Sequence, residues 1–409
     1  MNTKKISLRF ICLTLVLCIC LPLAACKKDD PPVDNNNSED EKKIFTTNAK
    51  NNDFAGYGNY VFYEWGTVYR YNKKTETLDK ACRDVECDGE KCPLEGDISS
   101  IGGVYDGKLY FFVYKPMTIQ DKVFIGYQDI LSGEITVLKT MDSDLISLGS
   151  EYIYVEGEYV YYEATTLKEG GDKTNSNDYE RSICRISLDG KKDEVFIKCA
   201  ENEGMAIVCD GKIIMSSDGE LYSIDIETKE KRFLFDCEEY DTLNIVGNIR
   251  YVKGKIYFLA ESKHRYVPEV IGGEIRYKIL FSVDINTGEV KKVVEDPVVY
   301  FCVSDDAVYY VPFNFKILYM PEDYENNKDD LKVWWVDSTV YACDLDGKNI
   351  RAVYSNDKIS YSRRMAVFGG VLYSLIGDYD EEEHYYSSKV SFGAIDLETG
   401  KIAKKERPK

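Results

Sequence analysis

Apolar positions along this chain gather in short runs rich in Tyr, Val and Ile, and seven of these runs lead to an Asp, Asn or Ser and then to a polar turn. The runs are too short to favour helices, and apolar and polar residues alternate in the segment LYSIDI from Leu221, as expected of a strand. Neighbouring copies lie roughly 40 to 60 residues apart, the spacing expected of four-stranded propeller blades. The polar positions are Asn72, Asp129, Ser187, Asp225, Asp284, Asp344 and Asp396.

A second apolar run precedes each of these positions, usually after a turn that contains glycine, and a third short strand follows in several repeats. The second runs begin at Asn59, Lys108, Glu158, Lys212, Lys255, Ala307 and Val371. A single sheet of this kind would leave both of its apolar faces in water, whereas sheets arranged in a ring cover one another. The pattern therefore predicts an all-β chain in which residues 44–409 form a seven-bladed β-propeller of four-stranded antiparallel blades. Two β-sandwich domains are the alternative, but they do not require such a repeat.

The first 25 residues have a basic start, an apolar stretch, and Leu23, Ala24 and Ala25 directly before Cys26. This segment resembles a bacterial lipoprotein signal peptide with its lipobox. The resemblance implies cleavage before Cys26, acylation of that residue with palmitate-type chains, and a lipid anchor at the extracytoplasmic face of the cell membrane. A transmembrane anchor is the alternative, although the stretch is short for the roughly 20 apolar residues that a span needs. Residues 26–43 are polar and are predicted to be a disordered tether.

Composition narrows the function classes. The formal net charge of −19 argues against nucleic acid as a partner and against direct docking to anionic lipid headgroups. Only His264 and His384 are present, so a multi-histidine metal site is impossible within one chain. Neither a G-x-S-x-G elbow nor an H-E-x-x-H motif occurs in the sequence. We therefore expect no cofactor and no catalytic metal.

Three cysteines, Cys82, Cys87 and Cys92, lie close together after the first blade's outer strand. A disulfide that staples this loop, with one thiol left over, is the favoured interpretation for an extracytoplasmic chain. A three-thiolate metal or iron-sulfur site is the alternative, but four-residue gaps are longer than the usual C-x2-C zinc spacing.

The repeats from Asn59 to about Ala403, together with Cys82, Cys87, Cys92 and Pro93, resemble a family of Gram-positive-type β-propeller lipoproteins. That family has repeats of the form DGxIYYxxxxxLYRIDLDGK and an early C-x-D-P-x-C-x-H-x(n)-C-P segment. The resemblance implies the propeller fold and the lipid-anchored location. Asp88 and Gly89 stand where the family has a His, which weakens a metal interpretation of the cysteines.

In each repeat, a connection joins the second apolar run to the run that leads to the polar position. It is short in the first and fourth repeats but long in several others, at 167–178, 263–274, 313–331 and 378–386. Because each insertion occupies the same connection, all are expected to project from one face of the ring. Aromatic residues there, mixed with acids, are the candidate ligand contacts: Trp65, Phe313, Phe315, Tyr319, Trp334, Trp335, Tyr385 and Tyr386.

The function predicted from these features is non-catalytic binding of a glycan, a peptide or an envelope protein on the loop-rich face. Flat aromatic faces beside carboxylates suit such ligands. Two alternatives remain open: a glycan-active enzyme that uses carboxylates near the channel mouth, and a scaffold for cell-envelope assembly.

Overall fold

The computed structural model describes residues 54–65, 67–82, 98–115, 122–142, 152–168, 170–172, 175, 178–200, 202–266, 275–319, 332–336, 338–380 and 385–408. The chain divides into two units, Met1–Glu41 and Lys42–Lys409, and every described residue belongs to the second. The predicted signal peptide, the tether, Cys26, Cys87 and Cys92 therefore lie outside the described residues. Within the described part, no helix has the length and apolar character needed to cross a bilayer.

Four strands that are consecutive in the chain form each of the first four blades. Blade 1 contains β1 (Phe54–Tyr57), β2 (Tyr60–Glu64), β3 (Val68–Asn72) and β4 (Thr77–Lys80). Blade 2 contains β5 (Ile98–Tyr105), β6 (Lys108–Lys115), β7 (Lys122–Asp129) and β8 (Ile135–Asp142). Blade 3 contains β9 (Ile153–Glu156), β10 (Tyr159–Leu167), β11 (Tyr179–Ser187) and β12 (Asp193–Lys198). Blade 4 contains β13 (Gly204–Cys209), β14 (Lys212–Ser217), β15 (Glu220–Asp225) and β16 (Lys231–Asp236).

The remaining three blades follow the same antiparallel order, with one addition in blade 6. Blade 5 contains β17 (Thr242–Val252), β18 (Lys255–Tyr266), β19 (Ile275–Asp284) and β20 (Val290–Lys292). Blade 6 contains β21 (Val298–Val303), β22 (Ala307–Tyr319), β24 (Thr339–Asp344) and β25 (Arg351–Ser355), and β23 (Lys332–Val336) pairs with the far end of β22. Blade 7 contains β26 (Ile359–Phe368), β27 (Val371–Asp380), β28 (Tyr385–Asp396) and β29 (Ile402–Lys405).

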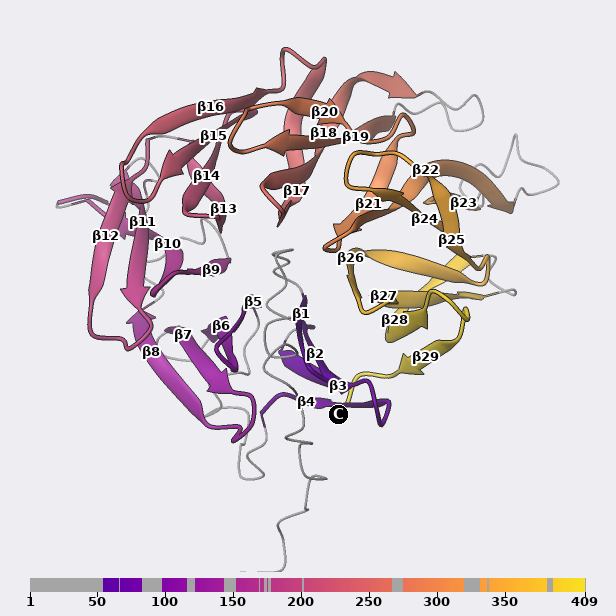
Figure 1. The fold of residues 1–409 in the computed structure, drawn as a ribbon, viewed down its shortest axis with the longest axis horizontal. Coiled ribbons are helices and arrows are strands. Elements are labelled where there is room, and N and C mark those ends of the chain that lie inside the picture. The colour runs from indigo at the N-terminus through magenta and orange to yellow at the C-terminus, as the bar shows by residue number, and fades with distance from the viewer. Residues whose placement is uncertain are drawn as a thin grey trace, which may run out of the picture. The chain divides into compact units, whose positions relative to one another are not determined.

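The blades stand in a ring, and the first strand of each lies nearest the centre (Figure 1). Each innermost strand contacts the next, and β1 contacts β26, so the ring is closed by the first and last blades. The prediction of an all-β, seven-bladed propeller is confirmed. Both closing blades are built from their own consecutive strands, so side-chain contacts join them.

The sequence repeat has a direct explanation in packing. The same position of the second strand is fully buried in every blade, where it packs against neighbouring sheets. These residues are Val61, Leu109, Val160, Ile213, Ile256, Val308 and Leu372. Because each sheet needs a neighbour to bury such residues, the inter-blade clusters hold the ring together.

The repeated polar residue closes the turn between the third and fourth strands. The Asp225 carboxylate accepts the backbone N–H groups of Glu227 and Thr228 at 3.0 and 2.9 Å. Backbone hydrogen bonds of this kind lower the pKa values of the aspartates in several blades. The shifted residues are Asp129, Asp225 and Asp396, held chiefly by the N–H groups of Ser132, Thr228 and Thr399 respectively.

The long connections differ from expectation in one respect. Segments 263–274 and 313–331 were expected to be insertions, but β18 continues to Tyr266 and β22 to Tyr319, so part of each is strand. Antiparallel pairing extends the hairpin because it satisfies backbone groups that a loop would leave to water. The face that carries these extensions is called the long-hairpin face below. The connections between blades reach the same face, since the strands alternate in direction.

Candidate ligand groove on blade 5

Neighbouring blades differ in height on the long-hairpin face. The second strand has six residues in blade 4 but twelve in blade 5, and the turn after β14 spans only Asp218 and Gly219. The outer half of the β18–β19 hairpin therefore rises above blade 4. The side of the hairpin that looks toward blade 4 has no equivalent strands opposite it, and a groove forms at this step.

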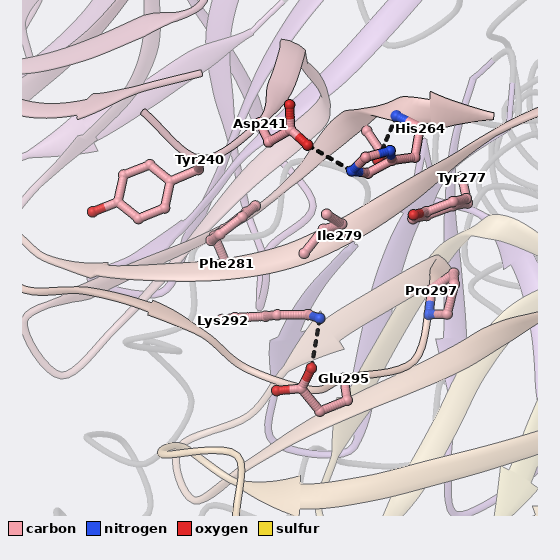
Figure 2. Close-up of a pocket in the computed structure, with 10 residues that line it drawn as sticks. Tyr240, Asp241, His264, Tyr277, Ile279, Phe281, Lys292, Glu295 and Pro297 are labelled. Carbon is pink, nitrogen blue, oxygen red and sulfur yellow. Dashed lines mark hydrogen bonds and ion pairs between the residues drawn. The ribbon is translucent and has the colours of Figure 1, made fainter. Parts of the chain in front are cut away.

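The blade 5 groove has a volume of about 570 Å³ (Figure 2). Its floor is apolar, with Phe281 buried and Ile279 half-buried in the cluster shared by blades 4 and 5. Tyr240, from the connection between those blades, stacks on Phe235 with ring centroids 5.0 Å apart. The full lining is Tyr240, Asp241, Ser262, His264, Tyr277, Ile279, Phe281, Lys292, Glu295 and Pro297.

A β-bulge orients one wall of the groove. The pairing of β18 with β19 shifts between Glu261 and Arg265, so that three residues of β18 stand opposite Tyr277. Within the bulge, the backbone N–H of His264 donates to the hydroxyl of Ser262 at 3.1 Å. Bulges re-aim side chains in this manner. The His264 side chain turns toward the connection from blade 4, where its Nε2 lies 2.6 Å from Oδ2 of Asp241.

The opposite wall comes from the connection between blades 5 and 6. The Nζ of Lys292, the last residue of β20, lies 2.7 Å from Oε2 of Glu295. Figure 2 shows this pair and the His264–Asp241 pair on either side of Ile279 and Phe281. Each wall thus offers one acidic and one basic group above an apolar floor, an arrangement suited to a ligand with both polar and apolar parts.

The groove residues do not form a hydrolytic triad in this geometry. The Ser262 hydroxyl accepts a backbone N–H, and the residue is fully buried, so a substrate cannot reach it. Among the described residues, no three His, Cys, Asp or Glu side chains are placed to hold a metal ion. The lining of the groove offers hydrogen-bonding groups, charged groups and apolar contact.

The aromatic residues predicted to contact a ligand have different surroundings. Trp65 is half-buried beside Tyr63 and Tyr69, with ring centroids 6.1 and 6.2 Å away. Phe313 is half-buried at the start of the β22 extension, where it is paired in register with Val336. Tyr386 is 4% exposed, and its hydroxyl donates to the Asp357 carbonyl at 3.0 Å, so its ring is part of the blade 7 packing.

For the other five aromatic residues, only the backbone is described. All of them lie in the extended hairpins of blades 6 and 7, and ligand contact by them stays a prediction: Phe315, Tyr319, Trp334, Trp335 and Tyr385. Cys82 is half-buried against the cluster between blades 1 and 2. Its partners within the predicted disulfide or metal site, Cys87 and Cys92, are outside the described residues.

Sequence reasoning missed Tyr240, Asp241 and Tyr277. The available signal was the contrast between a two-residue turn in one repeat and a long hairpin in the next. Such a contrast in hairpin length predicts that the longer hairpin has an uncovered sheet face toward the shorter one, although it does not predict which residues line that face.

Fold and groove together define a seven-bladed propeller with a ligand-sized recess on its long-hairpin face. No protein-family model matches the chain, and no curated protein matches its sequence. Solved structures match its fold. An acylaminoacyl peptidase of Pyrococcus horikoshii is similar with a TM-score of 0.50 and 11% identity, over 89% of this chain and 53% of the peptidase.

A structure described as one of two prolyl endopeptidases matches with a TM-score of 0.52 and 13% identity, over 89% of this chain and 50% of that one. A puromycin hydrolase matches with a TM-score of 0.50 and 11% identity, over 88% of this chain and 54% of the hydrolase. This chain thus spans about half the length of the solved structures that it matches first. At these identities the likeness establishes the fold alone.

Proposed function

We propose that this chain is a non-catalytic binding protein that is anchored at the extracytoplasmic face of the cell membrane by acylated Cys26. It binds a glycan, a peptide or a protein partner on its long-hairpin face, and the blade 5 groove is the contact site. The observation that carries the proposal is the groove itself, an apolar floor between one wall with the His264–Asp241 contact and another with the Lys292–Glu295 ion pair. The peptidase names among the structural neighbours are compatible with a peptide ligand but transfer no activity to this chain.

A photo-cross-linking experiment in living cells tests the location of binding. A benzophenone side chain is installed at Tyr277 in the groove and, as the control, at Glu227 in the turn after β15 on the opposite face. We expect a covalent adduct from position 277 and none from position 227. Digestion of the adduct with protease or with muramidase identifies its chemical class. Adducts of equal yield from both positions, or from neither, would contradict the proposal.

Membrane anchoring is tested separately by Cys26→Ala. We expect the wild-type chain in the membrane fraction and the variant in the soluble extracytoplasmic fraction, because two or more acyl chains hold a protein stably while none does. A variant that stays with the membrane after processing would overturn the lipid anchor.

A further inference from the structure

The outer edge of β19 is only partly covered by its own blade. On that side β20 pairs with β19 along Phe281–Val283, and the N–H of Val293 donates to the Leu280 carbonyl at 2.8 Å. From there the chain continues toward blade 6, and Glu295 and Pro297 of this connection line the groove together with Tyr277 and Ile279, while β19 extends back to Ile275. No described strand pairs with residues 276–279 on this side.

The backbone groups of the uncovered stretch have a defined direction. Asp284 donates its N–H to Glu289 across the turn to β20, and Leu280 accepts from Val293, so both residues face the outer edge. Successive residues of a strand face alternate sides in the sheet plane. Lys278 and Arg276, two and four residues before Leu280, therefore direct their N–H and C=O groups outward. This is a template for an added strand.

The two faces of β19 differ in chemistry at this edge. Tyr277 and Ile279 project into the blade 5 groove, whereas Arg276 and Lys278 project from the opposite face. Glu261 is paired in register with Lys278, and its Oε1 lies 4.0 Å from Nη1 of Arg276. Among the side chains that the structure describes on that face of the β18–β19 hairpin end, two cations thus stand beside one carboxylate, in a chain whose net charge is −19.

We propose that the open edge of β19 binds an extended peptide as an added antiparallel or parallel strand. Alternate side chains of the peptide are apolar and enter the blade 5 groove, and the residues between them are acidic and face Arg276 and Lys278. This inference rests on the proposed function and specifies its ligand: a peptide segment in which apolar and acidic residues alternate.

A displayed library of random dodecapeptides, selected on the full chain in detergent, supplies the probe. We expect enrichment of sequences in which acidic and apolar residues alternate. The consensus peptide is then synthesised with single N-methyl groups placed at successive positions. Because only every second N–H of an added strand points at β19, methylation should weaken binding about tenfold or more at alternate positions and little at the positions between. All of these peptides are measured against the same unaltered protein, so a change in affinity cannot come from a change in protein folding.

Two variants of Lys278 provide the matched test on the protein side. Lys278→Ala removes one charge but keeps the edge N–H, and we expect weakening of only a few fold that fades at high salt. Lys278→Pro also removes the outward N–H, which β18 does not use, and we expect a further loss of about tenfold while the thermal midpoint stays near that of Lys278→Ala.

Failure of this inference is distinguishable from failure of the proposed function. Selection of no peptide, or N-methyl effects without a period of two, would overturn the added strand. Equal affinities of the Ala and Pro variants would do the same. In each of these cases an adduct from position 277, but not from position 227, would leave binding on the long-hairpin face intact.

Discussion

Two of the places where a low blade stands beside a taller one are built differently. At the step between blades 4 and 5, the exposed side of the tall hairpin is left open as a groove. At the step between blades 7 and 1, β27 has ten residues and β2 has five, and side chains of both blades pack against each other; a cavity of about 170 Å³ between these blades lies instead beside the turns that hold Glu76 and Lys401. Trp65 packs there beside Tyr69, and the guanidinium of Arg407 lies 5.7 Å from the Trp65 ring.

Polar contacts also cross the closing step. Arg364 of β26 forms an ion pair with the buried carboxylate of Glu64, and its Nη1 donates to the Glu64 carbonyl at 2.9 Å. The Arg407 Nε donates to the Tyr69 hydroxyl at 2.9 Å. Unequal hairpins therefore produce a recess only where side chains of the neighbouring connections do not fill the space between them. The filled step joins the two ends of the ring, and the open one leaves a groove of about 570 Å³.

The largest effect is expected from the apolar contact that closes the ring. Phe392 is fully buried, with its ring 4.6 Å from that of Tyr63 and 5.0 Å from that of Tyr71. Phe392→Ala should lower the free energy of unfolding by about 3–5 kcal/mol in urea titrations, because it leaves a cavity between blades 7 and 1. Ile279→Ala, in the half-open groove, is the control and should cost much less. Similar losses for the two variants would mean that the steps do not differ in packing.

Trp65 is the residue that makes the closing step unlike the groove. Trp65→Ala should cost about 2 kcal/mol of unfolding free energy, since a half-buried indole loses part of its apolar contact. Trp65→Phe should restore much of this stability. If Trp65→Ala unfolds at the wild-type denaturant concentration, the step is held by other contacts.

Acid should also weaken the contact between blades 7 and 1 on the face opposite the long hairpins. A hydrogen bond from Lys401 of blade 7 to Glu76 of blade 1, at 2.8 Å, lowers the pKa of Glu76. A folded-state pKa below the unfolded value stabilises the protein above the unfolded pKa of about 4.3, and the contribution is lost as the pH falls through the folded value. Hydrogen exchange in β3 and β28 should therefore rise as the pH falls through this range.

Lys401→Met is the matched variant for this acid effect. It should raise exchange in the closing blades at neutral pH and converge with the wild type in acid, because the Glu76 pKa is no longer depressed. An unchanged pH profile in the variant would show that the ion pair does not stabilise the closure.

The smallest stability effect is expected in the groove. Tyr277→Ala should change the unfolding free energy by no more than about 0.5 kcal/mol, because this half-exposed side chain lies at an uncovered sheet face. The same variant should weaken binding of the selected peptide. A large drop in thermal midpoint would show instead that Tyr277 supports the blade, as Trp65 does at the other step.

The propeller could be predicted because the residues that define each blade lie close together in the sequence and recur in every blade. The Asp, Asn or Ser at the end of the third strand caps its own turn, as Asp225 does, and the residue equivalent to Ile213 is buried in every blade. Each contact spans few residues along the chain, so apolar spacing and turn chemistry disclose it. The long-hairpin face followed from the same register, since every extension occupies the same connection.

The groove was not predictable in the same way. Asp241, His264 and Glu295 come from two inter-blade connections and a bulge, and none belongs to the repeated motif. Trp65, predicted from the sequence as a ligand contact, packs beside Tyr63 and Arg407 at the ring closure, and ligand contact by it stays a prediction. The length of a turn can be predicted from the sequence. Which side chains occupy the space beside that turn cannot be predicted in this way.

The sequence by itself determined the number of blades, the order of strands within them and the face on which the hairpins lengthen. Only the tertiary structure decided which of the two steps is filled and which is open. The physical reason is that burial at a step depends on connections from neighbouring blades, which meet only when the ring has closed. The residue types at the repeated positions follow from the packing of each blade. The recess follows from the difference in hairpin length between two neighbouring blades.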